Sequence, residues 1–485
     1  MSAQSGPTQS GSEVAQSGSG VALSPQDTVE RALAAARSDD CIVIADESSS
    51  ANLRWAGNTL TTNGVARSRQ LTVIAISRRG GEARVGVVSR AGVLEHQIAG
   101  IVAEAEFAAA EASPAEDAQP LVTSMTDGPP APSWQEPPLV TEIGVFGRFA
   151  AELGGAFDAA ASGARKLYGF AEHQLTSTYL GTSAGLRLRH DQPTGRLELN
   201  AKSADLIKSA WAGVGSRDFT DVDVVSMDAE LAQRLDWAAR SVELPAGRYE
   251  TLLPPTAVAD LLVYMYWSAG AKDALDGRTV FSKPGGGTRV GEALAPLPLS
   301  LHSDPAAAGL QCAPFVIAHA SSREASVFDN GLPTSRTDWI ADGTLGALIQ
   351  TRHTALLSGQ PVTPAIDNLI LTAGGAEGTV ADLVSRTSRG LLLTCLWYIR
   401  EVDPQTLLLT GLTRDGVYLV ENGEVTGAVN NFRFNESPVG MLSRITELGA
   451  TTPTLPREWG DFFTRTAMPP VRVEGFNMSS VSQAS

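Results

Sequence analysis

The sequence has few of the residues that form disulfide bridges or bind metals. Three cysteines, Cys41, Cys312 and Cys395, are spread over 485 residues, and no two of them form a C-x-x-C pair. An odd count at such wide spacing argues against a disulfide framework. The six histidines are equally scattered, so no H-x-H, H-x-x-H or H-x-x-x-H pair occurs. A zinc site with ligands at helical or strand spacing is therefore excluded.

Basic residues and long apolar runs are also scarce. The 37 Lys and Arg are outnumbered by 53 Asp and Glu, which gives a net charge of −16. Binding to a phosphate backbone needs clustered basic side chains, so we predict no nucleic-acid partner. No stretch reaches about 18 uncharged apolar residues, and the first residues do not resemble a secretory signal. We therefore expect a cytoplasmic protein without a membrane partner.

The sequence does have enough apolar material for sizeable cores and many turn-forming residues. Hydrophobic residues make up 43% of the chain, and it contains 47 Gly and 27 Pro. The length predicts two or three domains. Helical patterns alternate with strand pairs around Gly-containing turns, which predicts an α+β fold.

The N-terminal part is predicted as a disordered tail over residues 1–22 and an α+β domain over residues 23–244. The tail is rich in Ser, Gly and Gln. A helix should begin at Ser24-Pro25, because Ser is a good N-cap and Pro suits the first helical position. Hairpins are predicted at Gly57-Asn58 and at 79–81. The other predicted elements are strands 41–45, 52–56, 59–63, 70–77, 83–89, 166–179, 186–190 and 196–202, and helices 93–112, 141–161 and 229–242.

Two features mark the middle and the end of the chain. Residues 113–140 contain seven prolines, so we predict an extended strap there, because a packed core element cannot hold that many. Residues 245–485 begin with a helix over 255–269 and continue with short strand-like segments and Gly-rich turns, which predicts a β-rich C-terminal domain.

Four stretches, in one order along the chain, resemble the TldD/PmbA family. They are RWAGN with TNG at 54–64, PAGRYE before LLPP at 245–255, FDNGLPT with ADGTL at 328–345, and VENGEV with NFRFNESP at 420–438. The resemblance implies a cytosolic proteolytic system that degrades or trims unfolded peptides. In it a TldD-type subunit carries zinc, and a TldE/PmbA-type subunit pairs with it.

The residues that hold zinc in the TldD-type subunit have no counterpart in this chain. The family's H-E-x-x-x-H motif lies on the helix that opens the C-terminal domain, and a cysteine follows later. The matching helix reads PTAVADLLVYMYW at 255–267, with Asp260 as its one acid, and no cysteine follows Cys395. We therefore predict no catalytic residue, metal ligand or cofactor in this chain, and expect zinc in the TldD-type partner.

The same helix carries the candidate site residues Tyr264 and Trp267. Their spacing places them on one helical face. They are predicted to line a peptide groove or a subunit interface, although core packing is the more common role of such residues.

Three other patterns are interpreted as structural. His302, Cys312 and His319 lie in one loop-rich segment without ligand spacing. The G-x-S-x-G sequence at 181–185 is flanked by strands on both sides, whereas a nucleophile elbow leads from a strand into a helix. The Gly-rich run at 285–291 lacks the Lys-Ser/Thr ending of a phosphate-binding loop.

These observations predict a non-catalytic TldE/PmbA-like subunit that is active only with a TldD-type chain and that contacts unfolded peptides. The chain alone is expected to be able to form a homo-oligomer. Two alternatives stay open from the sequence. One is a stand-alone modulator that binds peptides or proteins without proteolysis, and the other is a peptidase with an atypical site.

Overall fold

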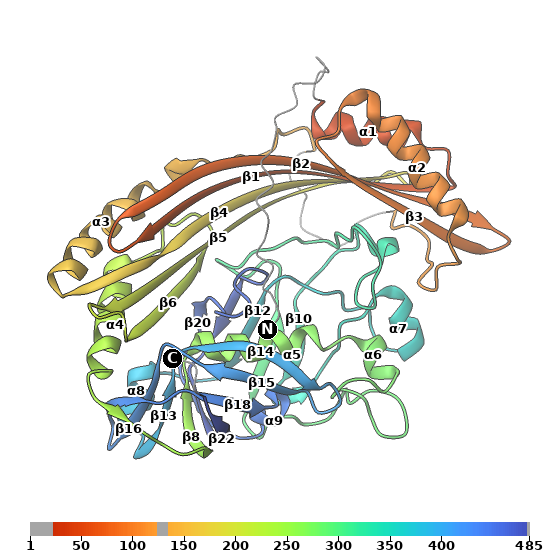
Figure 1. Ribbon diagram of the computed structural model, residues 1–485. Helices are drawn as coiled ribbons and strands as arrows, with labels where there is room; N and C mark the ends of the chain where they lie inside the picture. The colour runs from red at the N-terminus through yellow and green to blue at the C-terminus, as the bar shows by residue number, and fades with distance from the viewer. Residues whose placement is uncertain (1–22, 124–133, 483–485) are drawn as a thin grey trace, which may run out of the picture.

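The computed structural model describes residues 23–123 and 134–482. It shows a long curved sheet arching over a second part built from two further sheets (Figure 1). The predicted tail at 1–22, part of the predicted strap at 124–133 and residues 483–485 lie outside the described residues. The fold is α+β, as predicted from the sequence.

The arching sheet is antiparallel and has the strand order β3-β2-β1-β4-β5-β6. Its strands are β1 Asp40–Ala56, β2 Leu60–Arg79, β3 Glu82–Ala91, β4 Arg165–Thr182, β5 Arg187–Ser203 and β6 Ser209–Ser216. The turn predicted at Gly57-Asn58 and the one predicted at 79–81, which the structure places at Gly80-Gly81, both connect neighbouring strands.

The strands are much longer than the sequence predicted. The segments predicted at 41–45 and 52–56 are the two ends of the single strand β1, and those at 186–190 and 196–202 both belong to β5. The polar run DESSSA in the middle of β1 hid this continuity. Pro193 is tolerated within β5 because β6 pairs with β5 only from Gly195 onward.

Helices cover one face of this sheet at both ends. Val43 and Ala45 of β1 pack against α1 (Pro25–Ala35) and α2 (Ile98–Glu111). Ala51, Leu53 and Trp55 have the same parity along β1, so they share that face and pack under the second helix group. This group contains η2 Ile143–Phe146, α3 Gly147–Ser162 and α4 Val224–Trp237, while η1 Glu95–Gln97 precedes α2.

The helix predicted at 229–242 was misplaced. Helix α4 starts five residues earlier, at Val224, because the side chain of Asp223 accepts a hydrogen bond from Ser226 N and caps it. It ends at Trp237, and Ser241–Val242 instead form the short strand β7, which pairs with β17. The predicted helix at 141–161 likewise begins as the 3-10 turn η2 before it becomes α3.

Residues 134–141 of the Pro-rich segment cross the sheet between the two helix groups. Trp134 packs edge-on against Tyr179, and Arg189 donates to Pro137 O at 2.9 Å. Arg189 also lies 2.7 Å from Glu136 Oε2, and Thr141 N donates to Ser49 Oγ at 2.8 Å. Polar side chains at mid-strand are therefore satisfied by backbone groups of this segment.

The C-terminal part contains a six-stranded sheet of order β11-β10-β9-β12-β21-β20 and a ten-stranded sheet in which β14-β15-β18-β22-β8-β13-β16-β17-β7 form the main path and β19 pairs with β22. The strands are β8 Gly247–Leu253, β9 Leu299–Ser303, β10 Thr337–Ala341, β11 Thr344–Leu345, β12 Leu369–Ala373, β13 Arg389–Leu393, β14 Leu396–Asp403, β15 Leu408–Thr413, β16 Val417–Glu421, β17 Glu424–Val429, β18 Phe432–Glu436, β19 Ile445–Leu448, β20 Thr452–Thr454, β21 Thr466–Met468 and β22 Val471–Val481. The short helices are α6 Ala271–Leu275, η3 Val327–Asp329, α7 Arg352–Ser358, α8 Val380–Ser385 and α9 Pro438–Leu442.

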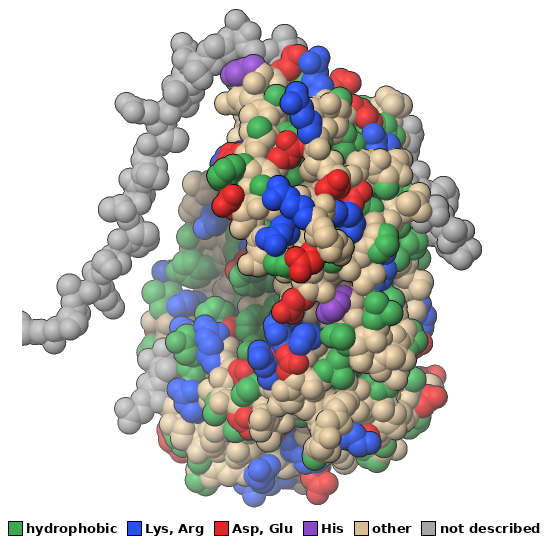
Figure 2. All heavy atoms as spheres, turned by 90° about the vertical axis from the view of Figure 1, so that its right-hand side faces the viewer, with side chains coloured by type: hydrophobic (Ala, Val, Ile, Leu, Met, Phe, Trp, Pro, Cys, Tyr) green, Lys and Arg blue, Asp and Glu red, His purple; other side chains and the backbone are tan. Residues whose placement is uncertain are grey.

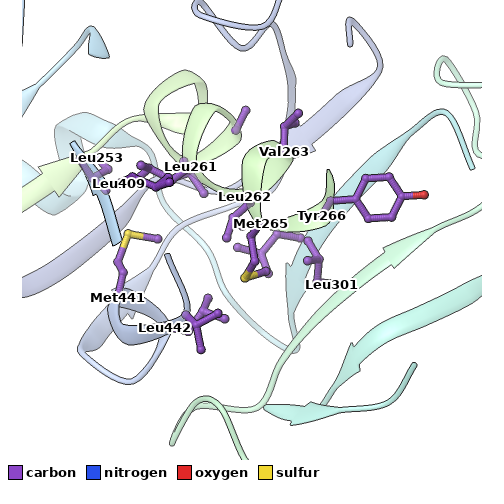
Figure 3. Close-up of a cluster of buried hydrophobic side chains, with 14 of the residues drawn as sticks. Leu253, Leu261, Leu262, Val263, Met265, Tyr266, Leu301, Leu409, Met441 and Leu442 are labelled. Atoms are coloured by element: carbon purple, nitrogen blue, oxygen red, sulfur yellow. The ribbon is translucent and has the colours of Figure 1, made fainter. Parts of the chain in front are cut away.

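Helix α5 (Pro255–Trp267) lies at the centre of this part. Its side chains belong to a large apolar cluster that includes residues from both C-terminal sheets and from α9 (Figure 3). Leu261, Leu262 and Val263 are all fully buried. The predicted domain boundary at 244/245 stays a prediction. Strand β7 lies before this boundary in the sequence but pairs with β17 of the ten-stranded sheet.

The surface has no dominant charged face in the view from the side of the arch. Figure 2 shows acidic and basic side chains interspersed there, and a hollow between the upper and lower parts of the molecule. No helix within the described ranges is both long and apolar enough to cross a membrane.

Candidate functional site

Helix α5 is a core helix with one accessible corner. It begins at Pro255, where the missing N–H of proline has no cost because the first helical N–H groups have no partner in the helix. Residues 257–263, 265 and 266 are buried, so nearly every side of the helix is covered. Tyr264 and Trp267 are the exceptions near its C-terminal end, and Trp267 is 37% exposed.

The one acid of this helix, Asp260, anchors a distant loop. Its side chain is fully buried, and Oδ1 accepts a hydrogen bond from Glu458 N at 2.8 Å. The main-chain oxygen of Asp260 accepts from Trp459 Nε1 at 2.7 Å. Burial raises the pKa of the Asp260 carboxyl well above its usual range, and Oδ2 has no partner among the described residues. The carboxyl is therefore best accommodated in its neutral form.

The anchored loop brings further aromatic residues to this corner, and we call the group the aromatic patch: Tyr264, Trp267, Trp459, Phe462 and Phe463. Phe462 belongs to it through its backbone, since its N–H donates to Trp459 O at 2.8 Å. The Trp459 ring lies 5.5 Å from Tyr264 and 5.3 Å from Trp267, and Trp267 lies 6.2 Å from Phe463. These separations are typical of favourable ring packing. Phe462 is 75% exposed, so part of the patch is accessible to a partner.

Charged residues frame the patch beside strand β14. The Glu458 carboxylate accepts hydrogen bonds from Tyr398 N at 2.9 Å and Ile399 N at 3.1 Å. Arg400 lies 3.2 Å from Glu458 Oε1 and 4.4 Å above the Tyr398 ring. The site thus combines accessible aromatic rings with a fixed charge pair at the end of a sheet.

The structure brings the predicted residues Tyr264 and Trp267 together on one side of α5. It also identifies Trp459, which the sequence did not single out. That contact joins segments far apart in the chain, and no local pattern in the sequence points to it.

His302, Cys312 and His319, the residues considered for an atypical metal site, do not form a cluster. His302 is buried on β9, Cys312 is buried in a loop, and His319 Nε2 lies 2.8 Å from Asp46 Oδ2 on the arching sheet. Burial lowers the pKa of His302 and raises that of Cys312 to about 11. Among residues 23–123 and 134–482, no three His, Cys, Asp or Glu side chains form a group that fits a metal ion. The α5 side chains include no His, Cys or Glu, and Asp260 is the one acid among them, so they offer no zinc donor set either.

The two other sequence patterns also have structural roles. Ser183 lies in the turn between β4 and β5, and its Oγ accepts a hydrogen bond from Cys41 N at 2.9 Å. This is a hairpin turn and not a strand-to-helix elbow. Gly285, Gly286 and Gly287 form a loop with positive φ at each residue, and no helix follows it directly.

A pocket of about 710 Å³ lies between α4 and the C-terminal part. Trp211, Trp237, Pro255 and Val425 give it largely apolar walls. Its most prominent cation, Arg234, already donates to Trp211 O at 2.5 Å and pairs with Glu230 on α4. Because this charge is already neutralised by its partner, the pocket does not identify a ligand.

Comparison with known proteins defines the class. Residues 246–480 match the family described as PmbA/TldA metallopeptidase C-terminal domain. The fold matches TldE from Thermococcus kodakarensis with a TM-score of 0.76 at 15% identity, over 93% of this chain and 99% of that one. No curated protein sequence matches the chain.

Two further structures have the same fold. A proposed modulator of a DNA gyrase from Thermotoga maritima matches with a TM-score of 0.75 at 17% identity, over 93% of this chain and 99% of that one. A proposed modulator of DNA gyrase from Bacteroides thetaiotaomicron matches with 0.73 at 14% identity, over 94% and 98%. The chain belongs to the TldD/PmbA family, as its sequence resemblance predicted.

Proposed function

We propose that this chain is a non-catalytic, TldE/PmbA-like subunit of a cytoplasmic two-component zinc peptidase. A TldD-type partner would hold the zinc and the catalytic glutamate. This chain would contact the unfolded peptide and help to present it to the partner. The two chains together would degrade or trim peptides.

One observation carries the proposal: the helix that would hold the zinc motif in a TldD-type subunit is a core helix here. From Ala257 to Tyr266 every α5 residue except Tyr264 is buried, and Asp260 is the one charged residue among them. The single acid is committed to holding the Glu458–Trp459 loop. Such a helix supports a binding role better than metal-dependent catalysis.

The aromatic patch supports contact with extended peptide. Rings such as Trp267 and Phe462 bind apolar side chains of many shapes, which suits a variable, unfolded substrate. The patch lies beside β14, which forms one end of the ten-stranded sheet. Glu458 already occupies two N–H groups of β14 at Tyr398 and Ile399. A peptide would therefore be held chiefly by side-chain contacts with the patch.

The test is metal content and peptidase activity of this chain alone and after co-expression with a TldD-type subunit. We expect zinc and cleavage of an unfolded test protein, such as casein, only in the co-expressed sample. Stoichiometric zinc or cleavage by the chain alone would overturn the proposal and favour an atypical peptidase. Failure of the two chains to associate would favour a stand-alone modulator.

A pair of variants tests the role of the patch. Phe462→Ala removes a ring that is 75% exposed, and Phe107→Ala removes one that is 69% exposed on α2. Both should fold normally, because little buried area is lost. We expect Phe462→Ala to raise the KM for peptide cleavage by the complex and Phe107→Ala to leave it unchanged. Equal KM values for the two variants would exclude peptide contact at Phe462.

A further inference from the structure

Half of strand β2 forms a long open sheet edge. Strand β3 pairs with β2 only from Gln70 onward, and Gly92 N bonds to Arg69 O. Among the described residues, only β1 pairs with residues 60–69 of β2. At about 3.3 Å per residue, this open edge is roughly 30 Å long. It belongs to the outer rim of the arch (Figure 1).

The other sheet edges are short or partly covered. The edge of β6, for example, lies against β20 and the backbone at Thr464. Strands β7, β11 and β20 have only two or three residues each. The edge of β3 is bridged by Pro114, and that of β14 is occupied by Glu458. The sequence LTTNGVARSR at 60–69 contains no Pro and no Lys, its two charged residues, Arg67 and Arg69, lie at the end next to β3, and the one register irregularity lies at its tip. Proteins normally protect long edges by such devices, so the uncharged, proline-free stretch at 60–66 indicates a pairing surface.

Apolar side chains border the same edge. Val65 is 62% exposed, and Leu139, Val140 and Ile143 of the neighbouring segment are 51%, 45% and 42% exposed. A groove of about 540 Å³ runs between residues 67–69 and residues 138–140. Backbone groups free to pair and a bordering apolar strip are together what a strand-to-strand interface requires.

We propose that this edge pairs antiparallel with the same edge of a second copy of the chain, centred on Gly64. In this register each residue i lies opposite residue 128 − i, so Leu60 lies opposite Ser68 of the second copy. The paired strand then ends just before the position that β3 occupies beside Gln70. Moving the centre to Val65 would place Leu60 of the second copy opposite Gln70, where β3 already lies.

The residues that face each other in this register are compatible. Arg67 lies opposite Thr61, Val65 opposite Asn63 and Ala66 opposite Thr62, so no like charges are directly opposed. Gly64 faces its own copy on the two-fold axis, where the absence of a side chain permits close approach. The contact is self-complementary, as a two-fold dimer requires, and the two arching sheets become one. This inference does not depend on the proposed function.

A charge-swap experiment tests the edge and its register. Thr62 and Ala66 are both exposed and lie opposite each other across the proposed axis. In Thr62→Glu/Ala66→Glu, carboxylates oppose carboxylates at two places. In Thr62→Glu/Ala66→Lys, each Glu opposes a Lys. Gly100→Glu/Ala103→Glu places the same added charge on α2 as a control.

Sedimentation velocity of the purified full chain from 1 to 100 µM measures the outcome. We expect dimers for wild type, the control and the Glu/Lys variant, and a dimer Kd raised about tenfold or more for the Glu/Glu variant. A monomeric wild type across this range would overturn the proposal. So would a Glu/Glu variant that dimerises like wild type, or a Glu/Lys variant that is as weak as Glu/Glu. Circular dichroism confirms that each variant folds.

Discussion

Replacing Asp260 by asparagine tests whether its buried carboxyl is neutral. Oδ1 accepts the Glu458 N–H at 2.8 Å, while Oδ2 has no partner among the described residues and burial raises the pKa. A carboxamide oxygen can accept the same hydrogen bond as a neutral carboxyl. We therefore expect Asp260→Asn to fold with a stability equal to or above that of wild type at neutral pH.

The size of the stability difference between wild type and Asp260→Asn should depend on pH. An aspartate in an unfolded chain has a pKa near 3.9. Because the folded-state pKa is higher, the folded chain keeps its proton over a pH range in which the unfolded chain has lost it. Stability from this group is full below about pH 3.9 and falls by up to about 1.4 kcal/mol per pH unit until the folded-state pKa is reached. The asparagine variant lacks this loss, so its advantage over wild type grows with pH and then levels off.

Asp260→Ala is the matched comparison. It leaves the Glu458 N–H without an acceptor and opens a small cavity, which costs about 1–3 kcal/mol at every pH. Thermal and urea unfolding of the three proteins between pH 4.5 and 8 measures these differences, and other titrating groups cancel between them. If Asp260→Asn is as destabilising as Asp260→Ala, Asp260 is ionised and held by the nearby Arg457, and the reasoning fails.

Three further changes have expected outcomes. Gly86→Ala should destabilise the fold by about 3 kcal/mol, because its Cβ would lie 2.1 Å from a backbone oxygen of α2. Gly100→Ala has open space around it and should raise the free energy of unfolding by about 0.5–1 kcal/mol. Calorimetry measures both changes. Arg189→Ala removes a guanidinium that is 1% exposed and pairs with Glu136. The free energy of unfolding should fall by about 3–5 kcal/mol, and limited proteolysis should cut near residue 136 sooner than in wild type. Burial lowers the pKa of His173, and also those of His190 and His302, so wild type should lose stability as pH falls from about 6.5 toward 5. His173→Gln should reduce this slope in thermal melts.

Elements with local signals were predictable from the sequence. The N-cap of Ser24 and the turn at Gly57-Asn58 depend on residues within a few positions, and both are confirmed. The continuity of β1 was not predictable, because its polar centre pairs with a segment that lies far along the chain. Ser49 is a buried polar residue, and its Oγ accepts a hydrogen bond from Thr141 N. Hydrophobic alternation cannot reveal a strand whose middle is satisfied in this way.

At the candidate site too, features set by nearby residues were predictable and those set by distant contacts were not. Helical spacing placed Tyr264 and Trp267 on one face, and the structure keeps them together. Trp459 was missed because its position depends on hydrogen bonds from its loop to Asp260. The sequence identified Asp260 only as an acid without a histidine nearby. Its anchoring role required knowledge of which loop packs on α5.

The packing of α5 has a consequence for how such a chain evolves. A histidine introduced on this helix would replace a buried apolar residue and reduce stability before any metal could bind. At its accessible end, the rings of Trp267 and Trp459 pack against each other, with their centroids 5.3 Å apart. A return to metal binding would therefore need several simultaneous substitutions, each costly alone. Under the proposed function, the zinc chemistry would accordingly come from the partner subunit.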